Sequence, residues 1–188
     1  MPRPRRYDDS LRLRLLDVAA ERIAHGGPAH LSLREAARAA GTSTSAVYGL
    51  FGSRDDLVAA VREEAFRRFG ARLGTVDRSA DPGADLLALG LAYREFALAE
   101  PNFYRVMFDD APQADAVQEP TFAVLRDAAA RLAPSLGATE AAVVLWALVH
   151  GLVGLELAGL VPGTDAERAS RYRRALVACG PVIVGTEA

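Results

Sequence analysis

The sequence has 188 residues, 51% of them apolar, with one cysteine and a formal net charge of −2. The single cysteine excludes an intramolecular disulfide and fits a reducing cytoplasm, and the dominance of Ala and Leu predicts an all-α protein with a substantial core. Residues 1–54 carry nine Arg and five Asp or Glu, whereas residues 55–188 carry thirteen Arg and nineteen Asp or Glu. A basic N-terminal part on an acidic remainder is typical of a protein whose N-terminal end faces DNA and whose other part faces a partner or ligand.

The N-terminal segment, MPRPRRYDD, begins with an arm rich in Arg and Pro. No apolar run follows its charges, so we expect the arm not to be a secretory signal. Two interpretations of this arm remain open: it contacts DNA, or it is a solubilising tail. The first helix is predicted over residues 10–25, where one stripe carries Leu13, Leu16, Ala20 and Ile23.

Residues 31–57, LSLREAARAAGTSTSAVYGLFGSRDDL, predict two short helices joined by a three-residue turn, with a third helix directly after them. Ser32 and Glu35 have the S-x-x-E spacing of a capping box, and Gly41 supplies the left-handed residue that ends the first helix. Ser43 or the Thr before it caps the second helix, whose first turn keeps short outward side chains. This geometry places a helix end in the DNA major groove.

The rest of the pattern predicts helices at about residues 54–73, 82–100, 102–108, 120–133, 140–160 and 165–180, or about nine in all. Thr164 and Glu167 form a second capping box, and the last helix is expected to end or kink before Pro181. Residues 109–119 are expected to be a loop or a partly helical connector. We predict an N-terminal domain over 1–54, a C-terminal domain over 75–188, and the 54–73 helix as their link.

Residues 8–62 resemble the DNA-binding domain of the tetracycline-repressor (TetR) family of bacterial transcription regulators. The resemblance rests on Ala24-His25-Gly26-Gly27, the capped helix, the Ala39-Ala40-Gly41 turn, Val47-Tyr48, Phe51, Arg54 and Leu57. Leu50 stands where the family often has His, and Arg54 where it usually has Lys. Further on, YREFALAEPNFYRVMF and the W-x-x-x-H-G spacing of Trp146, His150 and Gly151 look like the TetR subgroup named for Trp-His-Gly.

The resemblance implies a three-helix helix-turn-helix domain followed by a helical ligand-binding and dimerisation domain. It also implies a cytoplasmic, ligand-responsive regulator, a repressor by family analogy, that binds a pseudo-palindromic operator as a homodimer. A small apolar or aromatic effector would release it from the operator.

By alignment with the family, the residues expected to contact DNA are Ser32, Arg34, Ser43, Thr44, Ser45, Tyr48, Gly49 and Arg54. Arg34, Thr44 and Ser45 are the candidates for base edges, and Gly49 would let DNA approach the backbone; the others would contact phosphate. Three alternatives stay open: Tyr48 as a packing residue, Ser32 as a helix cap only, and Arg34 as solvated surface.

An apolar cavity in the C-terminal half is expected to bind the effector. The candidate lining residues are Tyr93, Phe96, Phe103, Tyr104, Met107, Phe108, Trp146 and His150. Aromatic residues at helical spacing are equally typical of an ordinary core. His150 is the polar candidate for orienting a ligand, and a satisfied core histidine is the alternative.

The 140–160 helix is apolar nearly all round, so we expect one of its faces to need an external cover. Gly151, Gly154 and Ala158 would allow a second helix to approach closely. Packing within the chain is the plain interpretation of these residues. The family resemblance implies instead a four-helix bundle made from two copies of the last two helices.

Other function classes have less support in the sequence. Neither catalysis, a cofactor nor a metal site is expected, because three His and one Cys appear in none of the usual motifs. Residues 141–161 are nearly long enough to span a bilayer, but His150 and Glu156 interrupt them, so we expect a buried or interface helix and no membrane. The remaining alternative is a helix-turn-helix used only for protein–protein contact.

Overall fold

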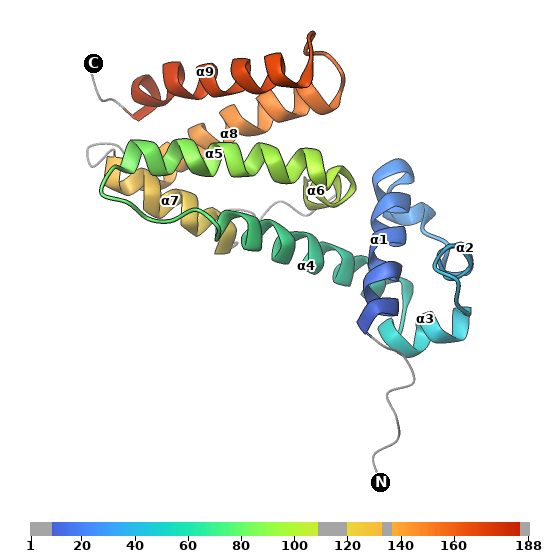
Figure 1. Cartoon of the computed structure of the whole chain (residues 1–188). Coiled ribbons are helices and arrows are strands. Elements are labelled where there is room, and N and C mark those ends of the chain that lie inside the picture. Colours follow the sequence, from blue (N-terminus) through green and yellow to red (C-terminus); the bar gives the residue numbers. More distant parts are fainter. Residues whose placement is uncertain (1–8, 109–119, 133–136, 185–188) are drawn as a thin grey trace. The chain divides into compact units, whose positions relative to one another are not determined.

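The computed structural model describes residues 9–108, 120–132 and 137–184, with only the backbone for 181–184. Within these ranges the chain forms nine α-helices, one 3-10 turn and no strand (Figure 1), which confirms the all-α prediction. They are α1 (Asp9–Gly26), η1 (Pro28–His30, the 3-10 turn), α2 (Leu33–Ala39), α3 (Thr44–Phe51), α4 (Arg54–Leu73), α5 (Pro82–Ala99), α6 (Pro101–Phe108), α7 (Pro120–Leu132), α8 (Ala138–Leu157) and α9 (Asp165–Val184). The N-terminal arm and the predicted 109–119 connector lie outside the described residues.

The chain divides into two compact units. The first unit is residues 1–68 with 102–113, and the second is residues 69–101 with 114–188. The division falls inside α4, so this helix contributes residues to both units. Nearly all of α6 belongs to the first unit, although its neighbours in sequence, α5 and α7, belong to the second.

In the first unit, α1 packs against η1 and α2, and α2 packs against α3. The largest fully buried side chains of this unit are Leu15, Leu16, Val47, Leu57 and Val61. The buried stripe of α1 is Leu11, Leu15, Leu16, Ala19, Ala20 and Ile23. Leu13 was predicted on this stripe, but its side chain is 41% exposed, so that assignment was wrong.

In the second unit, α5 packs against α7, α8 and α9, and α8 also packs against α7 and α9. One core cluster consists of Phe122, Ala129, Ala141, Ala142 and Leu145. On the side of α5 that faces α9, Gly90 allows a close approach: a Cβ built there would lie 2.6 Å from Leu176 Cδ1. The buried Tyr172 hydroxyl donates a 2.8 Å hydrogen bond to the Gly90 carbonyl, which fixes α9 on α5.

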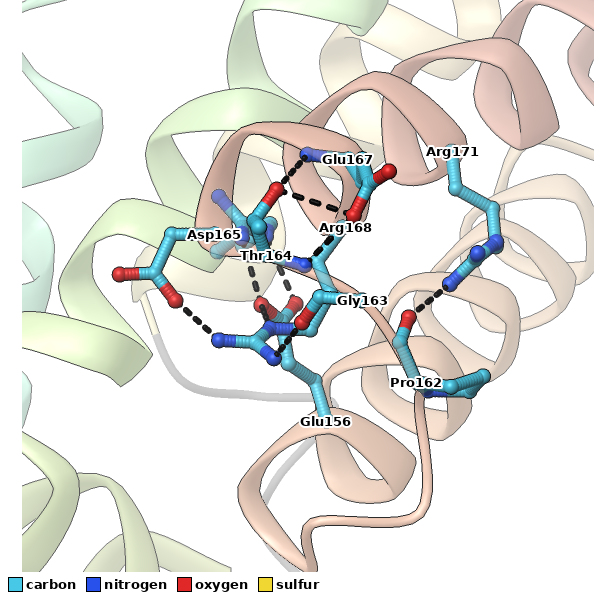
Figure 2. A network of polar contacts seen from close by, with 9 residues as sticks. Glu156, Pro162, Gly163, Thr164, Asp165, Glu167, Arg168 and Arg171 are labelled. Atoms are coloured by element: carbon cyan, nitrogen blue, oxygen red, sulfur yellow. Dashed lines mark hydrogen bonds and ion pairs between the residues drawn. The ribbon is translucent and has the colours of Figure 1, made fainter.

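The junction of α8 and α9 is held by charged side chains (Figure 2). The predicted capping box forms, because Thr164 N donates to Glu167 Oε2 at 2.7 Å and Glu167 N donates to Thr164 Oγ1 at 3.3 Å. The first of these hydrogen bonds lowers the pKa of Glu167. Arg168 donates to the Gly163 carbonyl at 2.5 Å and lies 3.4 Å from Glu156 Oε1 on α8. The turn is therefore tied to both of its helices.

Of the two outcomes predicted before Pro181, an end or a kink, the end does not occur, because α9 continues to Val184. Proline removes one backbone N–H donor and disfavours helix mainly in the interior. Here only three helical residues follow Pro181, so the missing hydrogen bond falls in the last turn. Helix ends are the least constrained part of a helix.

By length and composition alone, α8 could cross a membrane: its most apolar window has a mean hydropathy of 1.7 and is 22% buried. An interface helix of a water-soluble protein has the same pattern. Its buried Glu156 carboxylate accepts hydrogen bonds from Arg94 of α5 at 2.5 and 2.8 Å. This ion pair raises the pKa of Arg94 and gives the charge on α8 a protein partner.

Candidate nucleic-acid interface

The helices α2 and α3 form the predicted pair joined by a tight turn. Ser32 Oγ accepts a hydrogen bond from Glu35 N at 3.4 Å at the start of α2. Gly41 has a φ of 68°, and the next residue donates its N–H to the carbonyl of Ala37. Of the two caps that the sequence left open, Ser43 is the one used, and it accepts from Ala46 N at 3.1 Å. The turn chemistry of the sequence therefore sets the angle between the two helices.

One face of α3 is buried and the other is open. Ala46 and Val47 are buried, whereas Ser45, Tyr48 and Gly49 are exposed. The Tyr48 side chain is 54% exposed, so within this chain it is not a packing residue. The open face carries hydroxyl groups and a glycine, which let a polyanion approach the helix closely.

The remaining predicted contacts differ in their surroundings. Arg34 is exposed on α2, and Thr44 is half-buried at the start of α3. Arg54 is already engaged, because its Nη1 donates to the Ala29 carbonyl at 3.2 Å and its Nε lies 3.4 Å from Asp55. Arg54 therefore ties the start of α4 to η1, a role that no local pattern in the sequence indicated.

The predicted effector residues fall in both units. In the second unit, Phe69 of α4 packs its ring against Tyr93 and Phe96 of α5, with centroids 5.4 and 5.2 Å apart. The Tyr93 hydroxyl lies 3.1 Å from His150 Nδ1, and the Trp146 ring lies 6.2 Å from the His150 ring. Four of the predicted residues thus belong to one aromatic and polar cluster around His150.

The other four predicted effector residues, Phe103, Tyr104, Met107 and Phe108, belong to α6 in the first unit, and the first three are buried. The first unit has an open cavity of about 380 Å³, lined by Ile23, Ala24, His25, Gly27, Pro28, Val106 and Phe108. Of the predicted residues, Phe108 alone lines it.

The predicted interface residues, two on α8 and one directly after it, lie on an open surface of the chain. Gly151, Gly154 and Ala158 are exposed, and a Cβ built on either glycine would have no atom within 4 Å. Val144 and Leu155, on the same helix, are 46% and 48% exposed. These positions are separated by three, four or seven residues, which is the spacing of one helix face, so they form one apolar stripe along α8 and the residue that follows it.

Within the described part of the chain, no group of three or more His, Cys, Asp or Glu side chains is arranged to hold a metal ion.

The sequence-based interpretation missed the buried acid Glu64. Its signal was present, because Glu64 follows Val61 by three residues on the buried side of α4.

A capped helix-turn-helix with an open second helix, joined to an independent helical unit, defines a class: the DNA-binding regulators of transcription. Residues 15–61 match the family profile described as bacterial regulatory proteins, tetR family. Residues 86–179, half of the chain, match the profile described as tetracyclin repressor-like, C-terminal domain. The chain belongs to the TetR family of DNA-binding transcriptional regulators.

Solved structures share the fold over nearly the whole chain. A TetR-like transcriptional regulator from Rhodococcus sp. RHA1 has a TM-score of 0.76 at 20% identity, covering 97% of this chain and 98% of that one. The putative regulatory protein SCO4313 has a TM-score of 0.72 at 28% identity, covering 98% and 100%. PfmR, a TetR family regulator from Thermus thermophilus, has a TM-score of 0.71 at 18% identity, covering 93% and 99%. No curated protein sequence matches the chain.

Proposed function

We propose that this protein is a cytoplasmic, ligand-responsive repressor that binds a pseudo-palindromic operator as a homodimer and leaves it when a small apolar or aromatic effector binds. The observation that carries the proposal is the open face of α3, where Ser45, Tyr48 and Gly49 are exposed on a helix capped for the major groove. We assign DNA contact to a domain over 1–54 and effector binding and dimerisation to 75–188, linked by the 54–73 helix.

In this proposal the DNA contacts are Ser32, Arg34, Ser43, Thr44, Ser45, Tyr48, Gly49 and Arg54. Ser32 and Ser43 use their oxygen lone pairs as helix caps, which leaves each hydroxyl hydrogen to donate to phosphate. Arg34 is exposed and makes no ion pair among the described residues, so its guanidinium is open to guanine.

The test of DNA binding uses a fluorescent duplex that the wild-type protein selects from a random-sequence library. The logarithm of the binding constant should fall linearly with the logarithm of the salt concentration, and Arg34→Ala should weaken binding by about 1–3 kcal/mol. Arg78→Ala, which removes an exposed arginine from the loop before α5, is the charge-matched control. An affinity for the duplex that changes neither with salt concentration nor with Arg34→Ala would favour a helix-turn-helix that serves only protein–protein contact.

In a dimer, the second copy supplies a second α3 for the other half of the operator. The helices α8 and α9 would form the interface between the two copies. The exposed stripe of Val144, Gly151, Gly154, Leu155 and Ala158 supports this assignment, because a monomer would leave it in water. A glycine-lined stripe also lets a second helix come close. Sedimentation should therefore give a dimer.

Leu155→Glu should convert the dimer to a monomer, because it would bury an unpaired carboxylate between the two copies. Val124→Glu on α7 is the matched control, since Val124 is similarly exposed, at 43%, on a helix outside the proposed interface. A wild-type protein that sediments as a monomer refutes this part of the proposal.

We place the effector against the cluster of Tyr93, Phe96, Trp146 and His150 in the second unit, and we assign the chain to the Trp-His-Gly subgroup. The Tyr93–His150 hydrogen bond supplies a polar anchor among apolar rings. The fluorescent aromatic anion 1-anilinonaphthalene-8-sulfonate is a suitable probe, because Trp146 is the one tryptophan of the chain and binding beside it would quench its emission. Equal probe affinity in Tyr93→Phe, His150→Ala and wild type would exclude this location.

A further inference from the structure

In the first unit, the side chain of Arg68 joins three helices. On its own helix α4, Arg68 Nε donates to Glu64 Oε1 at 2.8 Å. Its Nη2 donates to Asp17 Oδ1 of α1, also at 2.8 Å. The centre of its guanidinium lies 4.1 Å from the centroid of the Phe103 ring of α6. One side chain therefore contacts α1, α4 and α6 together.

The neighbouring Arg67 shows that this arrangement is specific to Arg68. Arg67 donates to the same carboxylate, with Nε 2.7 Å from Glu64 Oε2, but its side chain is 62% exposed. The Arg68 side chain is 20% exposed, and it reaches α1 and α6. A planar guanidinium can donate to two carboxylates and stack on a ring at the same time, which a lysine ammonium cannot do.

The contacts of Arg68 all lie within the first unit, to which α6 belongs. Residues 102–113 group with residues 1–68 rather than with the helices that flank them in sequence. The Phe103 ring of α6 contacts Arg68, and α1, which Arg68 holds through Asp17, packs directly on α2 and η1. A displacement of α1 would therefore reach the helix-turn-helix.

We propose that Arg68 is a positioning residue for DNA binding, which fastens α6 and α1 to α4 so that α6 and the helix-turn-helix form one rigid body. This inference rests on the proposed DNA-binding function. Without the contacts of Arg68, the unit would spend part of its time in arrangements that do not fit DNA. A unit that is competent for one-tenth of the time binds about tenfold more weakly, because the apparent affinity scales with the competent fraction.

The test measures affinity for a fluorescent duplex selected with the wild-type protein, using the full-length chain. Arg68→Met should weaken binding about tenfold, whereas the charge-matched control Arg67→Met should stay within about twofold of wild type. Arg68→Lys keeps the charge but loses the second hydrogen bond and the ring contact, so it should also bind more weakly than wild type. A simple loss of positive charge predicts instead that Lys restores full binding.

Asp17→Ala supplies a second variant that is expected to fold, because the Asp17 side chain is 54% exposed on α1. Removal of a negative charge should by itself favour binding to a polyanion. Two results together would therefore support the proposal. Asp17→Ala alone should bind the duplex severalfold more weakly than wild type, and the double variant should bind no more weakly than Arg68→Met alone.

Two results would overturn the inference while leaving the proposed function intact. The first is equal affinity of Arg68→Met and Arg67→Met for the duplex. The second is an Asp17→Ala variant that binds as well as wild type or better. If the wild-type protein binds no duplex, the proposed function itself fails.

Discussion

Replacement of Glu64 by Gln should remove a large part of the acid sensitivity of the first unit. Hydrogen bonds from the Arg67 guanidinium, and then from Arg68, hold the pKa of Glu64 at about 2, against the effect of burial, compared with an ordinary value of 4.5. As the pH falls, the unfolded chain therefore takes up a proton on this group before the folded chain does. The free energy of unfolding must then decrease between about pH 5 and pH 2.

The size of the effect follows from the same shift. One pKa unit corresponds to about 1.4 kcal/mol, so ionised Glu64 contributes about 3 kcal/mol above pH 5, and most of this is lost by about pH 2. Glu64→Gln should lower the unfolding free energy at neutral pH by about this amount. Its stability should also fall less steeply with pH, so that the two curves converge in acid.

The assay is urea unfolding followed by circular dichroism at a series of pH values, with Trp146 fluorescence reporting separately on the second unit. Glu63→Gln is the matched control, because Glu63 is exposed on the same helix and should leave the curves unchanged. If Glu64→Gln and wild type lose stability in parallel from pH 5 to pH 2, the ion-pair reasoning is refuted.

Four further substitutions test the packing and the turns. Tyr172→Phe should lower the unfolding free energy by about 1 kcal/mol in urea titrations, because it removes the hydroxyl that donates to the Gly90 carbonyl. Glu156→Gln should cost about 3 kcal/mol and lower the calorimetric Tm, since it leaves buried arginine charge without its partner; an unchanged Tm would contradict this. The Ser79 hydroxyl and then the Arg131 guanidinium lower the pKa of Asp85, so Asp85→Asn should make acid unfolding of the second unit, followed by fluorescence, less steep. Gly41→Ala should lower stability by about 1 kcal/mol in urea unfolding through backbone strain alone, because its φ is 68° and no atom lies within 4 Å of the added Cβ.

The local structure was largely predictable because its signals are local. The Ser43 cap, the turn at Gly41 and the Thr164–Glu167 capping box each depend on residues within four positions of one another, and each forms. The expected end before Pro181 does not occur, because that expectation applied a rule for helix interiors within the last turn of α9. The sequence does not state where the interior of a helix ends.

Contacts between distant residues were not predictable in this way. Arg68 meets Asp17 across 51 positions, and Arg94 meets Glu156 across 62 positions. No periodicity within a helix selects those partners, because each depends on how helices pack. The buried Glu64 was the visible hint, since an acid on a buried stripe needs a cation nearby.

The effector prediction shows the same limit. Aromatic spacing along α5, α6 and α8 indicated apolar faces, but it carried no information about which faces meet. Tyr93 and His150 come together in the second unit, whereas the aromatic residues of α6 belong to the first. The residue types were thus predictable from the sequence, and their grouping was not.

Carboxylates held by arginines recur at the helix packings of both units, and their placement has a physical reason. Alanine-rich faces bring helices close together but bury little area that is specific to one partner. Arg68, which is paired with Glu64 on α4, also binds Asp17 on α1. Asp85 on α5 accepts a hydrogen bond from Arg131 on α7. Glu156 on α8 pairs with Arg94 on α5 and with Arg168 on α9. A buried ion pair adds little net stability compared with apolar residues of the same shape, but one partner without the other costs several kcal/mol. We infer that these pairs select which helices pack together, so an apolar replacement of both partners should preserve Tm while loosening the helix arrangement.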